Sequence, residues 1–146
     1  MNEEAMLARL EEYHRQIEAG LAVIRRHCDA RVPNSSELAV ARSELSSASL
    51  ARSAFVTDVV VPCLIKNSDV DLRAELSGLL CIFEAKRQIS CQHVMLWTVD
   101  TIEEDWAGYC AAARSIWAMM EDQVDKECRF LVARLKAGCG ADIVST

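Results

Sequence analysis

The chain has little that interrupts a helix, with only two prolines and five glycines among 146 residues. Aromatic residues make up 5% of it, and runs of β-branched residues are few. Glycine and proline weaken a helix interior by about 1 and 3 kcal/mol respectively, so their scarcity favours long helices. The length is that of one domain and is sufficient for a full core without disulfides or metal.

The chain also lacks a long uncharged run, whereas a membrane-spanning helix needs about 20 mostly apolar residues. Its first residues, MNEEAMLARLEEYHR, are acidic and amphipathic, unlike a signal peptide. The net charge of −6 argues against binding to nucleic acid, which requires a basic face. We therefore expect a cytoplasmic protein that contacts neither membrane nor nucleic acid.

The seven cysteines include no CxxC pair, which excludes a zinc ribbon or a thioredoxin-type motif. We expect most of them to be small buried hydrophobic residues in a reducing compartment. Candidates for redox chemistry are Cys128, which lies beside Lys126 and Arg129, Cys63, and Cys139 between two glycines. A redox thiol requires a lowered pKa in a basic, exposed setting.

Apolar residues recur at intervals of three and four over four segments, which is typical of helices that face a bundle core. The segments run from about 3 to 28, from 37 to 66, from 69 to 97 and from 103 to 136, and short polar turns join them. We predict an all-α, antiparallel up-and-down four-helix bundle over residues 1–137. Gly138 and Gly140 are expected to stop the last helix, leaving a flexible C-terminal tail at 138–146.

One polar or ionisable residue interrupts the apolar seam on three of these helices. These residues are His14, Arg52 and Glu127. Counting about 1.5 Å per residue places them at one height in the bundle, together with Gln123 and with Cys81 or Glu84 on the third helix. Burying such groups costs free energy unless they find partners, so we predict a buried polar layer. The alternative for each is a hydrogen-bonded core residue, or for Arg52 a side chain that reaches past the core to water.

The segments around the layer resemble the bacterial hemerythrin-like (HHE cation-binding) domain over roughly residues 13–135. His14 in EEYHRQIE matches the family's first-helix histidine, and Glu127 in QVDKECRFL matches its fourth-helix glutamate. In that last stretch Gln123 replaces a family histidine. In RSAFVTDVVVPCL, Arg52 replaces a histidine and Val56 a glutamate. The run IEEDWAGY is similar to the family as well.

The resemblance implies a hemerythrin-like bundle whose di-iron site has been lost. The chain has only three histidines; His27 lies at a helix end, and His93 lies about 13 Å above the layer. Arg52 cannot ligate a metal, and its charge repels one. We expect Arg52 to form a buried ion pair with Glu127 or Glu84 at the former metal position.

These observations predict a non-catalytic regulatory or protein-interaction module, with a protein partner or self-association and with no cofactor. The alternative is a protein that binds iron, zinc or oxygen through an altered ligand set. Residual ligands for it would be His14, Glu127, Cys81 and Glu84. A cysteine-based redox sensor is a third possibility. No nucleophile–base pair, phosphate loop or dinucleotide motif indicates an enzyme.

Overall fold

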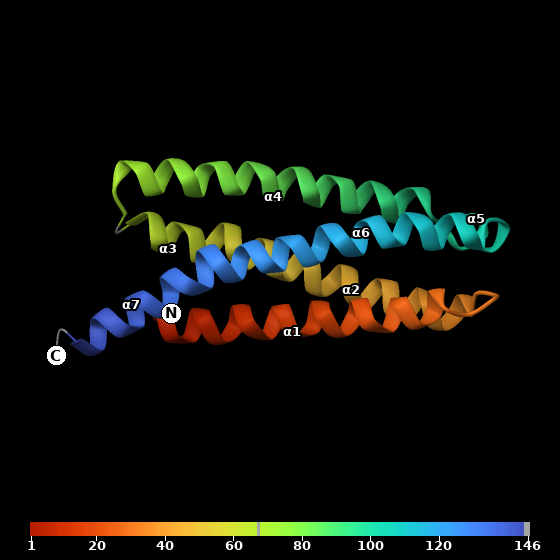
Figure 1. The fold of residues 1–146 in the computed structure, drawn as a ribbon, viewed down its shortest axis with the longest axis horizontal. Helices are drawn as coiled ribbons and strands as arrows, with labels where there is room; N and C mark the ends of the chain where they lie inside the picture. Colours follow the sequence, from red (N-terminus) through yellow and green to blue (C-terminus); the bar gives the residue numbers. More distant parts are fainter. Residues whose placement is uncertain (67, 145–146) are drawn as a thin grey trace.

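The protein is all-helical, as the sequence predicts. A computed structural model describes residues 1–66 and 68–144, except for the side chains of 139–144, and the described residues form no strand. Its elements in order are α1 (Glu3–Cys28), α2 (Ser35–Phe55), the π-helical turn η1 (Val56–Val60), α3 (Val61–Lys66), α4 (Val70–Leu96), α5 (Val99–Glu104), α6 (Trp106–Glu127), the π-helical turn η2 (Cys128–Val132) and α7 (Ala133–Val144). Figure 1 shows α1, α2–η1–α3, α4 and α6–η2–α7 as long rods, with α2–η1–α3 and α6–η2–α7 each continuous and α5 a short connector.

Polar side chains cap the starts of the helices. Asn34 and Asp69 accept backbone hydrogen bonds at the starts of α2 and α4. Asp105 caps the start of α6 by accepting from Gly108 N–H. Asp100 lies inside the additional short helix α5, which Thr98 caps. A side-chain acceptor two or three residues before the first free N–H groups satisfies one of them, which explains where these helices begin.

The last helix is longer than predicted. It continues through Gly138 to Val144, so residues 138–144 extend α7 where the sequence predicts a tail. A Cβ atom added at Gly138 would overlap the carboxylate of Glu3. This part of α7 lies against the start of α1, where Gly138 faces the end of the flexible Glu3 side chain, and the glycine does not stop the helix.

The core divides into two apolar clusters. The first contains Ile17, Leu21, Ile24, Cys28, Leu38, Ala41, Leu45, Ile102, Tyr109, Cys110, Ala113, Trp117, Met120 and Val124. The second contains Met6, Leu10, Phe55, Val56, Val60, Val61, Leu76, Phe83, Leu131, Val132 and Leu135. On α1, on α2 and at the end of α6, the residue between the two clusters is His14, Arg52 and Glu127 respectively. The polar residues therefore lie between two apolar regions.

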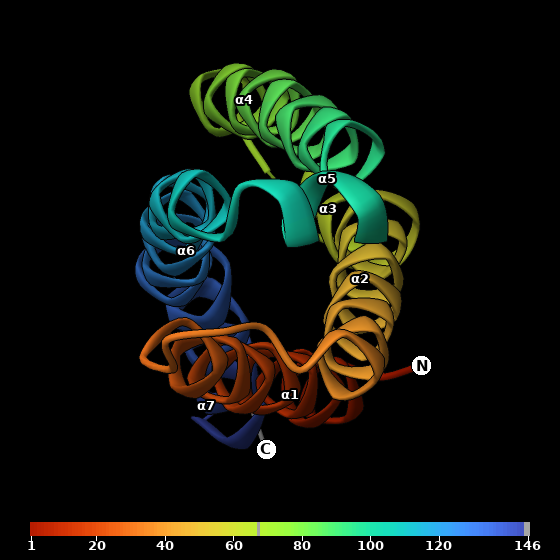
Figure 2. The same cartoon turned by 90° about the vertical axis from the view of Figure 1, so that its right-hand side faces the viewer.

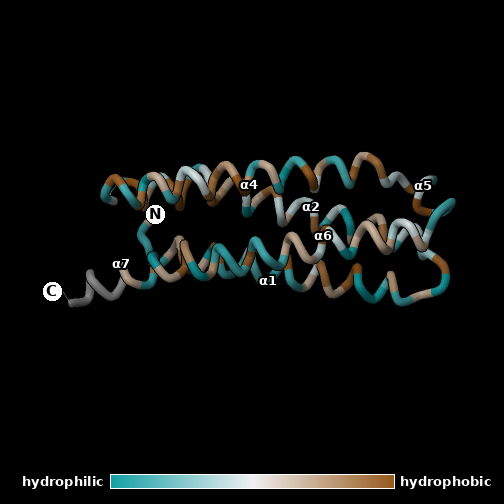
Figure 3. Tube along the Cα trace, turned by 45° about the horizontal axis from the view of Figure 1, so that its top comes forward, coloured by the Kyte–Doolittle hydropathy of each residue, from teal (hydrophilic) through white to brown (hydrophobic). Residues whose placement is uncertain are grey.

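Helix α4 contributes much less to the core than the other long helices. Of its 27 residues only Leu76 and Phe83 are buried. Figure 2, viewed along the rods, shows α4 opposite α1 with α6 and α2 on the two sides. Figure 3 shows hydrophobic and hydrophilic residues alternating along all the long helices, α4 included. Several of the apolar residues of α4 nevertheless face solvent: Ile82, Ile89, Val94, Met95 and Leu96.

The stretch Ser35–Lys66 is long and apolar enough, by length and composition, to cross a membrane. Its most apolar window of 18 residues has a mean hydropathy of 1.5, and 33% of that window is buried. Arg52 and Asp58 interrupt the stretch, which is why no long uncharged run is found in the sequence. A core helix of a bundle has the same length and composition, and here the stretch supplies Leu38, Phe55 and a buried arginine to the interior.

Candidate functional site

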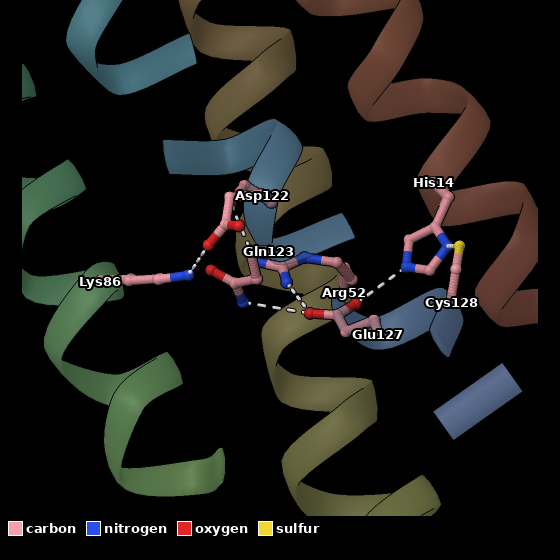
Figure 4. Close-up of polar contacts among 8 residues, drawn as sticks. His14, Arg52, Lys86, Asp122, Gln123, Glu127 and Cys128 are labelled. Carbon is pink, nitrogen blue, oxygen red and sulfur yellow. Dashed lines mark hydrogen bonds and ion pairs between the residues drawn. The ribbon is translucent and has the colours of Figure 1, made fainter. Parts of the chain in front are cut away.

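The candidate site is a layer of four buried polar side chains between the two apolar clusters. His14 comes from α1, Arg52 from α2, and Gln123 and Glu127 from α6. Their exposed fractions are 5%, 5%, 6% and 0% respectively. Figure 4 shows the four side chains converging from three helices. The structure thus brings together the layer members expected on the first, second and fourth segments.

Glu127 is the centre of the layer. Its Oε1 lies 2.8 Å from Nε2 of His14, and its Oε2 accepts hydrogen bonds from Arg52 Nη1 and, at 3.1 Å, from Gln123 Nε2. A carboxylate can only accept hydrogen bonds, so the proton between His14 and Glu127 belongs to the imidazole Nε2. Both carboxylate oxygens are therefore engaged by donors from within the protein, and one of these donors is a cation.

The second nitrogen of His14 faces a cysteine. Cys128 Sγ lies 3.6 Å from His14 Nδ1. In the neutral tautomer that donates through Nε2, Nδ1 accepts this weak hydrogen bond from the thiol. Cys128 directly follows Glu127 along the chain and therefore holds the opposite side of the same imidazole ring. Sequence reasoning did not connect these two residues, because only the fold places residue 128 beside residue 14.

Arg52 lies inside the protein and does not extend past the core to water. Besides Glu127, it has a long contact of 3.5 Å from Nη2 to Ser49 Oγ, and its Nε atom is buried without a hydrogen-bond partner. Charged groups at this depth are stabilised only by close partners. The ion pair with Glu127 is consequently the interaction that compensates both charges. The predicted pair is present with Glu127 and absent with Glu84.

Two π-helical turns border the layer. The turn η1 begins four residues after Arg52, and η2 begins directly after Glu127. Pro62 explains the first, since proline has no N–H and its ring displaces the carbonyl four residues earlier; the N–H of Val61 bonds to Val56 O instead. No proline accompanies the second turn. Because π-turns inside α-helices are frequent at functional sites, their position supports the layer as the candidate site.

The third helix does not supply the layer members expected of it. Glu84 is exposed and bonds to Arg87 on its own helix, a hydrogen bond that lowers the pKa of its carboxyl. Cys81 is exposed as well. The inward residue at this height is Phe83, and at about 100° per residue Cys81 and Glu84 point away from it. The prediction of Cys81 or Glu84 in the layer is therefore wrong. Both residues lie at the predicted height along the bundle, but their side chains are on the outward face of α4.

Most of the described cysteines are not buried, contrary to expectation. Only Cys28 and Cys110 are buried; the latter directs its thiol toward the carbonyl of Cys28 at 3.9 Å. Burial, reinforced by Cys110, raises the pKa of Cys28 to about 12. Cys63 and Cys91 are half-buried, and Cys81 and Cys128 are exposed. The side chain of Cys139, the other redox candidate, lies outside the described residues.

The setting of Cys128 opposes the redox expectation. Its two basic neighbours are already paired, Lys126 with Asp122 and Arg129 with Asp125. Partial burial of the thiol and the negative charge of Glu127 raise its pKa above the ordinary value. The thiolate is the reactive form, so a raised pKa makes the thiol less reactive at neutral pH. The prediction of a lowered pKa for the Cys128 thiol is therefore wrong.

Alkylation of Cys128 by iodoacetamide is therefore expected to be slower at pH 7 in the folded protein than in the unfolded chain. Its rate is expected to rise at a higher pH than the rate for a free cysteine does, because the pKa of the Cys128 thiol is raised. Mass spectrometry of the peptide that contains Cys128 measures this rate across pH. The same peptide from urea-unfolded protein is the control. A rate in the folded protein that exceeds the unfolded rate at pH 7 would restore the redox interpretation.

The layer offers few free donor atoms. Within the part of the chain that the structure describes, no group of three or more His, Cys, Asp or Glu side chains is placed to hold a metal ion. Comparison with known protein families, characterised proteins and solved structures gives no significant match. The function of the layer is therefore argued from its own geometry.

Proposed function

We propose that the protein is a non-catalytic, hemerythrin-like helical bundle that has lost its di-iron site and acts as a cytoplasmic regulatory or protein-interaction module. In this proposal the four rods form an antiparallel up-and-down four-helix bundle of hemerythrin type, and the layer occupies the place of the metal centre. The observation that carries the proposal is the bond from Arg52 to Glu127 inside that layer.

The donor set supports the loss of the metal. Of the expected residual ligands only His14 and Glu127 reach the layer, and they are bonded to each other at 2.8 Å. Gln123 donates its amide to the same carboxylate. A cation at this position would lie beside the guanidinium of Arg52 and would compete with it for Glu127. These residues do not fit a di-iron centre, and the proposal includes no step that requires one.

The exposed side of α4 supports an interaction role. Ile82 and Ile89, seven residues apart and therefore on one face of the helix, are 45% and 48% exposed, and Met95 near its end is 78% exposed. Exposed apolar groups of this kind are common at surfaces that contact other proteins. A protein partner or self-association through α4 is consistent with a bundle that carries no catalytic group.

Elemental analysis of the protein, purified without chelators and then loaded aerobically with ferrous iron, tests the proposal. We expect only substoichiometric iron after dialysis and no visible absorption band. A matched pair of variants locates any residual metal, since His14 lies in the layer and His27 lies at the end of α1. Trace iron is expected to be equal in wild type, His14→Gln and His27→Gln. Stoichiometric, coloured iron that disappears only in His14→Gln would replace the proposal by the metal- or oxygen-binding alternative.

A further inference from the structure

A second feature lies beside the layer, between α2, α4 and α6. It is a pocket of about 360 Å³ that borders the first apolar cluster and opens to solvent beside the exposed residues Leu50, Val94 and Met95. Its walls are mainly apolar, with Leu45 from α2, Val94 from α4, and Ile116, Trp117 and Met120 from α6. Cavities of 300–1,000 Å³ that combine an apolar wall with a few polar groups are typical of small-molecule sites.

The charged residues of this cavity are all of one sign. Arg42, Arg52 and Arg87 line it, and no aspartate or glutamate does, although the chain as a whole has a net charge of −6. Arg52 is compensated by Glu127, and Arg87 by Glu84 outside the cavity. Of the three arginines, Arg42 is therefore the one whose charge no carboxylate of the described residues compensates.

Arg42 has a hydrogen-bond donor for which the protein supplies no acceptor. Its Nη2 atom is buried and has no hydrogen-bond partner, and no ion pair of Arg42 is found among the described residues. The guanidinium lies 5.4 Å from the centre of the Tyr109 ring, a cation–π contact that fixes its position. A buried, charged donor without a partner costs free energy, and an anionic ligand would remove this cost.

His93 completes the polar end of the cavity. Its ring stacks on Tyr109 with ring centres 5.9 Å apart. Burial and the charge of Arg42 lower its pKa to about 4, so the imidazole is neutral at pH 7. A neutral imidazole donates one hydrogen bond without adding charge. Arg42, His93 and Tyr109 thus form one polar end, and the apolar wall extends from it toward the layer for about 11 Å between residues 42 and 49 of α2.

We propose that this cavity binds a small amphipathic carboxylate, whose carboxylate group pairs with Arg42 beside His93 and whose apolar body lies against Leu45, Trp117 and Met120. This inference deepens the proposed function, because it gives a regulatory module a chemical input. The regulatory role of the ligand rests on the proposed function, whereas binding of the ligand does not. Metal content decides the loss of the iron site, whereas ligand binding decides the cavity, so the two can fail separately.

Isothermal titration calorimetry and tryptophan fluorescence of the full chain test the inference with octanoate and 3-phenylpropionate as probes. At least one of them is expected to bind in the micromolar range. Acetate has the charge without the apolar body, and 1-octanol has the body without the charge, so both are expected to bind at least tenfold more weakly. Octylammonium is expected not to bind, because its charge has the sign of Arg42.

Arg42→Met keeps most of the apolar stem of the side chain and removes its charge. It is expected to weaken binding of the carboxylate at least tenfold and to leave binding of 1-octanol unchanged. Arg31→Met, in the exposed turn after α1, is the matched control and is expected to bind as wild type. Circular dichroism verifies that both variants are folded.

Amide chemical shifts on addition of the better probe locate the site. They are expected to change around Arg42, His93, Tyr109 and Ala113. The inference is overturned if neither carboxylate binds below millimolar concentration, if Arg42→Met binds as tightly as wild type, or if the shifts cluster at Ile82 and Ile89 on the outer face of α4, which would indicate surface adsorption.

Discussion

Replacing Arg52 with methionine is expected to lower the free energy of unfolding by about 3–5 kcal/mol. Methionine retains much of the apolar stem that packs in the interior, so the main loss is the charge. Glu127, with an exposed fraction of 0%, would then lose its arginine partner and keep only His14 and Gln123 as donors. Urea denaturation at pH 7, followed by circular dichroism, measures the change.

The control for this variant is Arg15→Met. Arg15 forms an ion pair with Glu12 at 2.7 Å, but both side chains are more than half exposed. Surface pairs of this kind contribute about 0–1 kcal/mol. If the Arg52 and Arg15 variants lose similar amounts of stability, the buried pair does not compensate Glu127 as the structure indicates.

Replacing Glu127 with glutamine is expected to destabilise the protein by a similar amount, about 3–5 kcal/mol. Glutamine has almost the same shape but leaves the guanidinium of Arg52 buried without a counter-charge. Its amide group also adds a donor where His14, Arg52 and Gln123 all donate already. The same denaturation experiment measures the effect.

Glu12→Gln is the matched control, because it removes an exposed carboxylate from the same kind of pair. It is expected to change stability by less than about 1 kcal/mol. A Glu127→Gln variant as stable as wild type would mean that the carboxylate is protonated in the folded protein, and the ion pair would have to be abandoned.

The layer could be predicted from sequence on three helices because it interrupts an otherwise regular apolar seam. His14, Arg52 and Glu127 each stand where the three–four spacing requires a hydrophobic residue. The third helix has a broader apolar distribution, with Leu72, Leu76, Leu79, Leu80 and Phe83. Its seam does not specify one inward face, and only Leu76 and Phe83 of this set are buried. Height alone was therefore insufficient to place Cys81 or Glu84.

The features that the sequence did not predict depend on contacts between distant segments. The turn η2 contains no proline or glycine that would indicate it in the sequence. Gly138 is a helix breaker by propensity, at about 1 kcal/mol, yet it continues α7 where that helix meets Glu3. The cavity arginine Arg42 has no local signal either, since only the fold shows that its donor is buried without an acceptor.

The layer and the cavity share two residues. Arg52 and Gln123 belong to the polar layer and also line the cavity. The layer thus closes the cavity on the side opposite to Arg42. The residue that replaces a metal ligand in the proposal is consequently also part of the wall on which an amphipathic ligand would rest.

A double-mutant cycle of Arg52→Met and Glu127→Gln is the most direct test of the central claim that these two charges compensate each other inside the protein. With both charges removed, neither is left buried alone, so the double variant should lose far less stability than the sum of the single losses. We predict a coupling free energy of about 3 kcal/mol from urea denaturation at pH 7. Losses that add to within about 0.5 kcal/mol would contradict the claim and leave Arg52 and Glu127 as independent residues.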